Sequence, residues 1–286
     1  MAGKTGEISA LLNLIEDPDE AVYQTVSSRL VEMGSEILPA LEEMTELEDD
    51  PVQLERISHI ISVIVLNRLE DSLLEWSQTD EKSLLDAAFF IHEFISKNVN
   101  KSSFFFEIEK VRKSIWLELN HYLTPLEEIN IFNKVLFAHF QYQTKEVSQS
   151  EIIHYDPGNL LFKKTSNAYP IAALYVILGE MLGIHLEVVA IPKQNLLAYI
   201  DSPESGEILT ENDILFYLDP GSGQVYSQKD IESYIQKLSP GEKITFFSSQ
   251  PRVEFLKKWL IEIARYEKRN RSIFNFERIM EMIKLI

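Results

Sequence analysis

The chain has 286 residues, 45% of them hydrophobic, and carries a formal net charge of −18 at pH 7. A charge of this sign repels phosphate backbones, so we expect no nucleic-acid partner. The chain contains no cysteine, which excludes disulfides, thiolate zinc sites and a thiol nucleophile.

The negative charge is unevenly spread. Residues 1–100 hold 6 Lys/Arg against 21 Asp/Glu, and residues 249–286 hold 9 against 5. We expect the basic run Ala264–Arg271 to be a solvated helix face or to dock on the acidic N-terminal part, with nucleic-acid binding as a weaker alternative. No segment has 18 uncharged apolar residues and the N-terminus has no signal-peptide core, so we expect a soluble cytoplasmic protein with no membrane partner.

The N-terminal segment reads as a series of short helices. An apolar face formed by Leu11, Leu12, Leu14 and Ile15 precedes "EDPDE", which places Pro18 at a first helical position. Apolar residues then recur at three- and four-residue steps through Val22, Val26, Leu30 and Met33, and Gly34 fits a helix C-terminus. This helix–"DPD"–helix–Gly–helix pattern resembles a HEAT-type repeat, followed by a looser copy from Pro51 through Trp76. One copy cannot bury its own face, so we expect it to pack on the rest of the chain.

The next elements change character near residue 142. Helices are predicted at 82–97, 104–121 and 126–140, with Thr124 as N-cap before Pro125 and the aromatic run Phe104–Phe106 as core. A polar, turn-rich loop follows, "TKEVSQSEIIHYDPGN". Beyond it the patterns predict strands at 186–191, 195–201, 214–219 and 243–247, and helices at 170–182, 228–236, 251–269 and 273–285.

Together these patterns predict an α+β fold that is mostly helical. Short turns between consecutive strands favour an antiparallel sheet with the 170–182 helix packed on it. We divide the chain into an N-terminal helical, HEAT-like domain (1–124), an α+β domain (125–248) and closing C-terminal helices (249–286).

Several sequence blocks occur in the order found in a known bacterial group. They are "LNLIEDPDEAVYQTVSSRLVEMGSEILPALEEM", "FNKVLFAHFQY", "YDPGN", "PIAALYVILGEMLGI", "IPKQNLLAYID" and "YLDPGSGQVYS". In this order they resemble the SirB family, which has a transglutaminase-like (cysteine-protease-like) core behind a helical segment. The resemblance implies a helix on an antiparallel sheet. Active members of this fold use a Cys at the helix N-terminus, a His on the following strand and an Asp on the next.

Carried onto this chain, the resemblance leaves only the third position intact. The family spacing back from Gly183 reaches Ala168, and Pro170 is the other candidate for the nucleophile position. Gln194 stands at the histidine position, Asn195 at the aromatic one beside it, and Asp219 at the aspartate. Glutamine cannot move a proton at neutral pH, so we expect no thiol acyl transfer and no catalytic residue.

Other chemistry finds little support. The histidines of the chain are His59, His92, His121, His139, His154 and His185. None of them pairs with another at metal-ligand spacing, so we expect neither a metal nor a cofactor. Ser166 lacks the context of a serine nucleophile. His154, close to Asp156, favours a turn. The motif "DPGSG" favours a turn at the end of a strand rather than a phosphate-binding loop. In that turn we expect the Asp219 carboxylate to accept hydrogen bonds from backbone amides.

The leading functional hypothesis is a non-catalytic protein-interaction or regulatory module with protein partners still to be identified and an open oligomeric state. An acidic helical surface favours basic partners. The alternative is a small-molecule binder or unorthodox hydrolase that uses the residual cleft near Ala168 and Pro170. The candidate lining residues of that cleft are Tyr155, Asp156, Tyr169, Gln194, Asn195, Tyr199 and Asp219.

Overall fold

The computed structural model describes residues 2–97, 99–191, 194–201, 213–238 and 251–286. Its α-helices are α1 (Ala2–Leu14), α2 (Glu20–Met33), α3 (Leu38–Leu47), α4 (Pro51–Gln78), α5 (Leu84–Ser96), α6 (Lys101–Trp116), α7 (Pro125–Asn133), α8 (Pro157–Lys163), α9 (Ala168–Leu182), α10 (Gln228–Leu238), α11 (Pro251–Arg269) and α12 (Ile273–Leu285). Its strands are β1 (Gln143–Thr144), β2 (Thr165–Ser166), β3 (Leu186–Ile191), β4 (Gln194–Ile200), β5 (Ile214–Leu218) and β6 (Val225–Tyr226).

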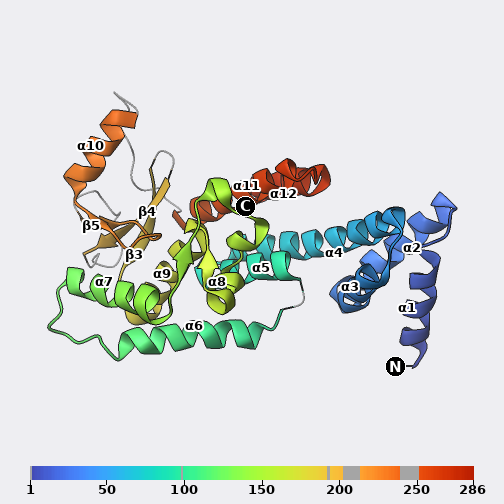
Figure 1. Ribbon diagram of the computed structural model, residues 1–286, viewed down its shortest axis with the longest axis horizontal. Coiled ribbons are helices and arrows are strands. Elements are labelled where there is room, and N and C mark those ends of the chain that lie inside the picture. The colour runs from blue at the N-terminus through green and yellow to red at the C-terminus, as the bar shows by residue number, and fades with distance from the viewer. Residues whose placement is uncertain (1, 98, 192–193, 202–212, 239–250) are drawn as a thin grey trace.

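The molecule is elongated (Figure 1). Helices α1 to α3 lie at one end, the sheet formed by β3 to β6 lies toward the other, and the long helix α4 runs along the molecule between them. The predicted α+β class, dominated by helix, is confirmed. The predicted strand at 243–247 lies outside the described residues.

The first helices follow the predicted pattern with one correction. Gly34 ends α2 with a left-handed φ of +66°, as predicted. Pro18 is not at a first helical position, because α2 begins at Glu20 and the Asp19 carboxylate caps it by accepting a hydrogen bond from Ala21 N (2.9 Å). Asp17 instead accepts a hydrogen bond from Asp19 N (2.8 Å), so the "DPD" turn lies wholly before the helix.

Helix α4 is one continuous helix of 28 residues. Asp50 caps it and Pro51 occupies its first turn, where the missing N–H of proline costs no hydrogen bond. The looser second copy of the repeat, predicted from Pro51 through Trp76, is therefore a single helix and not a helix pair.

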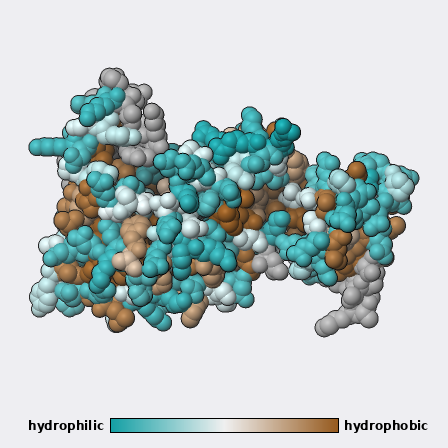
Figure 2. Space-filling model, viewed as in Figure 1, coloured by the Kyte–Doolittle hydropathy of each residue, from teal (hydrophilic) through white to brown (hydrophobic). Residues whose placement is uncertain are grey.

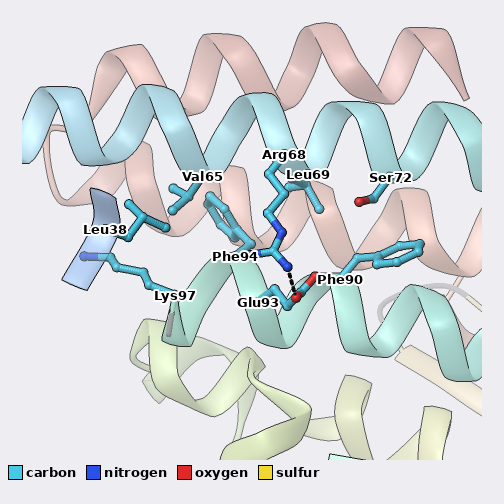
Figure 3. Close-up of a pocket in the computed structure, with 9 residues that line it drawn as sticks. All are labelled: Leu38, Val65, Arg68, Leu69, Ser72, Phe90, Glu93, Phe94 and Lys97. Carbon is cyan, nitrogen blue, oxygen red and sulfur yellow. Dashed lines mark hydrogen bonds and ion pairs between the residues drawn. The ribbon is translucent and has the colours of Figure 1, made fainter. Parts of the chain in front are cut away.

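An ion pair joins α4 to α5. Arg68 on α4 donates a short hydrogen bond to Glu93 on α5, beside a small pocket that Figure 3 shows from close up. The pocket has a volume of about 10 Å³, room for about one water molecule. Burial raises the pKa of Glu93, and the charge of Arg68 opposes the rise. This pair is a structural contact between helices.

The next helices deviate from the predicted bounds at their ends. Helix α6 starts at Lys101, capped by Asn100, and ends at Trp116. Phe104 is fully buried, but Phe106 is 62% exposed, because two residues along a helix turn a side chain to another face. The predicted start of α7 is confirmed: Thr124 and Glu127 form a capping box and Pro125 stands in the first turn. Helix α7 continues into a π-helical turn over Lys134–His139.

The segment predicted as a long loop holds more structure than expected. Two 3₁₀ turns cover Val147–Gln149 and Ile152–Tyr155, and β1 pairs in parallel with β2. Helix α8 begins at Pro157 with Asp156 as its N-cap. An Asp–Pro pair is a helix-start signal as well as a turn signal, and here the helix forms.

Helix α9 is the central element of the α+β part. Every residue from Tyr169 to Gly179 is buried, as expected for a helix that is covered on all sides. One sheet face packs toward α9 through Leu186, Val188, Leu197 and Tyr199. The opposite face packs against α10 through Val189, Leu196, Ala198 and Ile200, with Ile231 and Ile235 from the helix. The strand order is β3-β4-β5-β6 and all neighbours are antiparallel, as predicted.

The closing helices connect both halves of the molecule. Helix α12 lies alongside α4, and Arg278 donates hydrogen bonds to Glu70 (2.5 Å) and Asn67 (3.1 Å) on that helix. Within the basic run, Arg265 pairs with Glu262 on its own helix, and Lys268 lies over the ring of Phe276. None of the described helices combines the length and apolar character needed to cross a bilayer.

Candidate functional site

The start of α9 is the place where the family resemblance puts a nucleophile. Asn167 caps the helix: its side-chain oxygen accepts a hydrogen bond from Tyr169 N (3.0 Å), and its own N–H donates to His154 O (2.8 Å). Asn167 and Ser166 are fully buried, and the Ser166 hydroxyl donates to Asn167 O (2.9 Å). Ser166 therefore serves the cap and is shielded from solvent.

Aromatic side chains cover this end of the helix. The ring of Tyr169 stacks on Phe255 (centroids 5.8 Å apart) and on Trp259 (6.1 Å), both from α11. Phe255 and Trp259 are at most 2% exposed. Burial raises the pKa of Tyr169 to about 12, so its hydroxyl stays protonated at neutral pH and is not a base.

Tyr155 joins the same cluster from the other side. Its ring centroid lies 6.4 Å from that of Tyr169, and its carbonyl accepts a hydrogen bond from the indole N–H of Trp259 (3.2 Å). Burial raises the pKa of the Tyr155 hydroxyl, which faces the charged groups Glu262 and Arg269 of α11. We call these four residues, Tyr155, Tyr169, Phe255 and Trp259, the aromatic cluster.

Two predicted positions come from the start of β4. Asn195 is half-buried, and its side chain lies near enough to the Tyr169 hydroxyl to oppose the rise in the pKa of that hydroxyl, so it reaches α9. Gln194 begins β4 and pairs with Ile191, but its side chain lies outside the described part of the structure. The strand thus brings an amide, a neutral donor and acceptor, to the aromatic cluster.

The two candidates for the nucleophile position differ in environment. Ala168 is the first residue of α9 and is half-buried. Pro170 is buried and lines a void of about 10 Å³ with Phe104 and Leu160, which places it against α6 and α8. Pro170 is therefore packed on the helical side, away from the aromatic cluster.

Asp219 lies in the turn between β5 and β6. One carboxylate oxygen accepts a hydrogen bond from Gly221 N and the other from the Ser222 hydroxyl, each at 2.8 Å. Both oxygens therefore serve the turn, which is the structural role expected from the sequence. Tyr199, the remaining candidate, donates to Glu128 of α7 (2.5 Å) and is 8% exposed.

Asp156 belongs to a different cluster. Its carboxylate accepts hydrogen bonds from His92 Nδ1 (2.7 Å), from Gly158 N (2.7 Å) and from the Ser96 hydroxyl. The His92 ring stacks on Phe104 (5.1 Å) and covers Gly158, where an added Cβ would meet the ring at 2.1 Å. His92 is 5% exposed and Asp156 is 1% exposed. This pair holds α8 against α5 with no open side for a substrate.

The structure thus brings together only part of the predicted site. Tyr155, Tyr169 and Asn195 meet at the start of α9, whereas Asp156, Pro170 and Asp219 are engaged elsewhere. The residues at the meeting point supply hydroxyl and amide groups, which bind and orient but do not transfer protons at neutral pH. Among the described residues, no group of three or more His, Asp or Glu side chains is placed to hold a metal ion.

Comparison with known proteins identifies the family. The chain matches the family model of the transglutaminase-like superfamily over residues 104–260, from α6 into α11. This range is more than half of the chain, and the protein belongs to the transglutaminase-like superfamily. Neither a search of curated proteins nor a search of solved structures finds a match.

Sequence reasoning missed the residues that close the start of α9 and those that hold Asp156. The sequence predicts the 251–269 helix that holds Phe255 and Trp259, but it carries no signal that this helix covers α9. His92 lies 64 positions before Asp156, and nothing local connects them. The only local signal was the "DPGN" motif, in which Asp156 precedes Pro157 as a helix cap.

Proposed function

We propose that this protein is a non-catalytic transglutaminase-like protein that acts as a protein-interaction or regulatory module in the bacterial cytoplasm. The aromatic cluster is the main support: Phe255 and Trp259 occupy the space over the start of α9. The absence of cysteine from all 286 residues removes the thiol that active members use. Among the described residues, the groups that remain there are hydroxyls and amides, which do not themselves accept a proton at neutral pH.

The assignment to a group within the superfamily, and of its domains, rests on the sequence. The order of the blocks supports placing the protein in the SirB group. The helix–"DPD"–helix–Gly–helix pattern supports a HEAT-like segment, limited to one copy because α4 is a single helix. On this proposal residues 1–124 form the interaction domain, residues 125–248 the transglutaminase-like domain and residues 249–286 the closing helices.

The proposed partner surface is the acidic N-terminal arm, by which we mean helices α1 to α3. This arm stands at one end of the molecule, and hydrophilic residues cover most of the face drawn in Figure 2. Residues 2–47 hold 10 acidic against 2 basic residues, so the arm favours a basic partner.

The alternative is a small-molecule binder or unorthodox hydrolase in the residual cleft. It would need open space beside Tyr169 and Asn195. The packing of Phe255 and Trp259 on Tyr169 leaves that side of the helix covered, which argues against this alternative.

A cysteine-restoration experiment tests the non-catalytic proposal. The wild type and the Ala168→Cys variant would be assayed for amide hydrolysis and for acyl transfer to an amine, with Ala168→Ser as the matched control. We expect all three to remain at the buffer rate, because a thiol alone lacks a base and an open approach. Wild-type turnover that the Asn195→Ala variant abolishes would overturn the proposal.

A charge series tests the interaction surface. Glu43, Glu46 and Asp49 are exposed in or just after α3 and would be changed together to their amides. Glu254, Glu277 and Glu281, exposed on α11 and α12, would be changed to Gln as the matched control. We expect the arm variant alone to lose a partner that the wild type retains from host extract, with retention that falls as salt rises. Equal retention by both variants would exclude the arm.

A further inference from the structure

A second pocket lies at the C-terminal end of α9, where the helix meets the start of β3. Its volume is about 280 Å³, and its charged lining residues are Glu180 on α9, Glu187 on β3 and Arg252 on α11. Val176, Ile184 and Ile200 contribute an aliphatic wall. We call it the β3 pocket. It lies about 20 Å along α9 from Ala168, given the helical rise of about 1.5 Å per residue.

Arg252 is already engaged by the protein. Its Nη1 donates to Lys82 O (3.3 Å) and to Glu180 (3.4 Å), and its Nη2 lies 3.9 Å from Glu187. The separation from Glu187 is an ion-pair distance that is too long for a hydrogen bond. An incoming anion would therefore compete with two carboxylates for one guanidinium, so the pocket is poorly suited to anions.

Glu187 is the charged group of the pocket whose carboxylate has no hydrogen-bond donor among the described residues. Its side chain is 19% exposed, and among the described residues its carboxylate has the distant Arg252 pair and no hydrogen bond. Burial raises its pKa, Glu180 adds to the rise and Arg252 opposes it. A buried carboxylate without a hydrogen-bond donor is costly, and a bound donor of positive charge would relieve that cost.

The end of α9 adds negative potential. The last turn of the helix contains no basic residue, and Gly183, its C-cap, lines the pocket. The partial negative charge at a helix C-terminus favours cations. Glu180, Glu187 and the helix end therefore act together against the single charge of Arg252. A divalent metal is less suitable, because the described residues offer no group of three acidic or histidine ligands.

We propose that the β3 pocket binds an organic monocation, a primary ammonium group on a short aliphatic chain. The ammonium would donate to Glu187 and Glu180, and the chain would lie on Val176, Ile184 and Ile200. A volume near 280 Å³ suits a ligand about the size of an amino-acid side chain. The ligand is either a free small amine or the lysine side chain of a polypeptide. This inference is independent of the proposed function, because it concerns the other end of α9.

The test is an NMR titration of the methyl-labelled full chain with n-butylammonium, using n-butanol and butyrate as matched neutral and anionic probes. We expect shifts of the Ile184 and Ile200 methyl resonances with a Kd of about 1–10 mM for the ammonium alone. Glu187→Gln should weaken binding about tenfold, since it removes a charge-assisted hydrogen bond. Glu254→Gln, exposed on the same helix as Arg252, is the control and should bind as the wild type does.

A second variant controls for loss of binding through misfolding. Glu180 is 52% exposed, so Glu180→Gln should fold normally and still weaken binding about threefold. A titration with Nα-acetyl-lysine N-methylamide distinguishes the two sources of the ammonium group. If this compound binds like n-butylammonium, the pocket takes the lysine side chain of a polypeptide. If only n-butylammonium binds, the pocket takes a free amine. Equal shifts with n-butanol, a preference for butyrate, or undiminished binding by both Gln variants would overturn the proposal.

Discussion

The two ends of helix α9 differ in what covers them. At the N-terminal end, Tyr169 lies beneath Phe255 and Trp259, and the predicted catalytic positions carry no nucleophile. At the C-terminal end, Glu180 and Glu187 face Arg252 across a pocket of about 280 Å³. Helix α11 contributes to both ends, with aromatic side chains at one and a charged side chain at the other.

This contrast suggests how a scaffold without its thiol chemistry can remain stable. Aromatic packing where a cleft would otherwise lie adds buried apolar area, which favours folding. The β3 pocket does the opposite, because the mostly buried carboxylate of Glu187 has no hydrogen bond among the described residues. We therefore expect changes at the N-terminal end to cost stability and a neutralising change at the C-terminal end to add some.

The largest effect is expected for Trp259→Ala. Trp259 is fully buried, stacks on Tyr169 and donates to Tyr155 O, so the variant should lose about 3–5 kcal/mol of unfolding free energy in urea denaturation. Trp116→Ala is the control: Trp116 is 59% exposed and its loss should change stability by less than about 0.5 kcal/mol. Equal losses in the two variants would mean that Trp259 does not close the start of α9.

The sequence predicted most of what depends on neighbouring residues. Thr124 before Pro125 marked the start of α7, Gly34 marked the end of α2, and the strands β3, β4 and β5 were each found to within a residue or two. Caps and strand patterns are local, so they are visible in one sequence.

The site could not be predicted in the same way, because its contacts join distant segments. Trp259 meets Tyr155 across 104 positions, and His92 meets Asp156 across 64. A single sequence carries no record of such pairs. The resemblance pointed to the start of α9, but it gave no sign that α11 covers it.

The next largest effect is expected for Asp156→Ala. Asp156 follows Tyr155 and holds this segment to α5 through His92 and Ser96. The change leaves His92 Nδ1, the Ser96 hydroxyl and Gly158 N without their acceptor, so we expect a loss of about 3 kcal/mol in urea denaturation.

A matched control separates the stability contributed by the N-cap hydrogen bond from that contributed by the buried contacts with His92 and Ser96. Asp50 also caps a helix before a proline, and it accepts a hydrogen bond from Val52 N (2.8 Å), but it is exposed. Asp50→Ala should cost about 1 kcal/mol, the ordinary value of an N-cap. If the two variants lose the same amount, the His92 and Ser96 contacts contribute nothing to stability.

A smaller loss is expected for Tyr169→Phe. The ring and its stacking stay, while the polar interaction of the hydroxyl with Asn195 is lost, so the variant should lose about 1 kcal/mol of unfolding free energy. Tyr122→Phe, at a residue that is 91% exposed, should leave the urea midpoint unchanged. A stability gain in Tyr169→Phe would show that the hydroxyl is strained or unsatisfied at this end of the helix.

The smallest effect, of opposite sign, is expected for Glu187→Gln. Burial raises the pKa of Glu187 in the folded state. The stability that its protonated form contributes is therefore complete below the unfolded pKa and is lost as pH rises through the folded pKa. Glutamine does not titrate, so the variant should become more stable than the wild type as pH rises, measured as the difference between two series of urea denaturation curves.

The charges around the pocket determine the sign of the pH-dependent stability difference between Glu187→Gln and the wild type. Arg252 on α11 opposes protonation of Glu187, Glu180 on α9 favours it, and His185, just before β3, lines the same pocket. Ile200→Val, in the aliphatic wall, is the control: it should lower stability by about 1 kcal/mol equally at every pH, because it removes a methylene group and no charge. A pH-independent difference for Glu187→Gln would mean that Glu187 is already satisfied, and the contrast between the two ends of α9 would then reduce to packing alone.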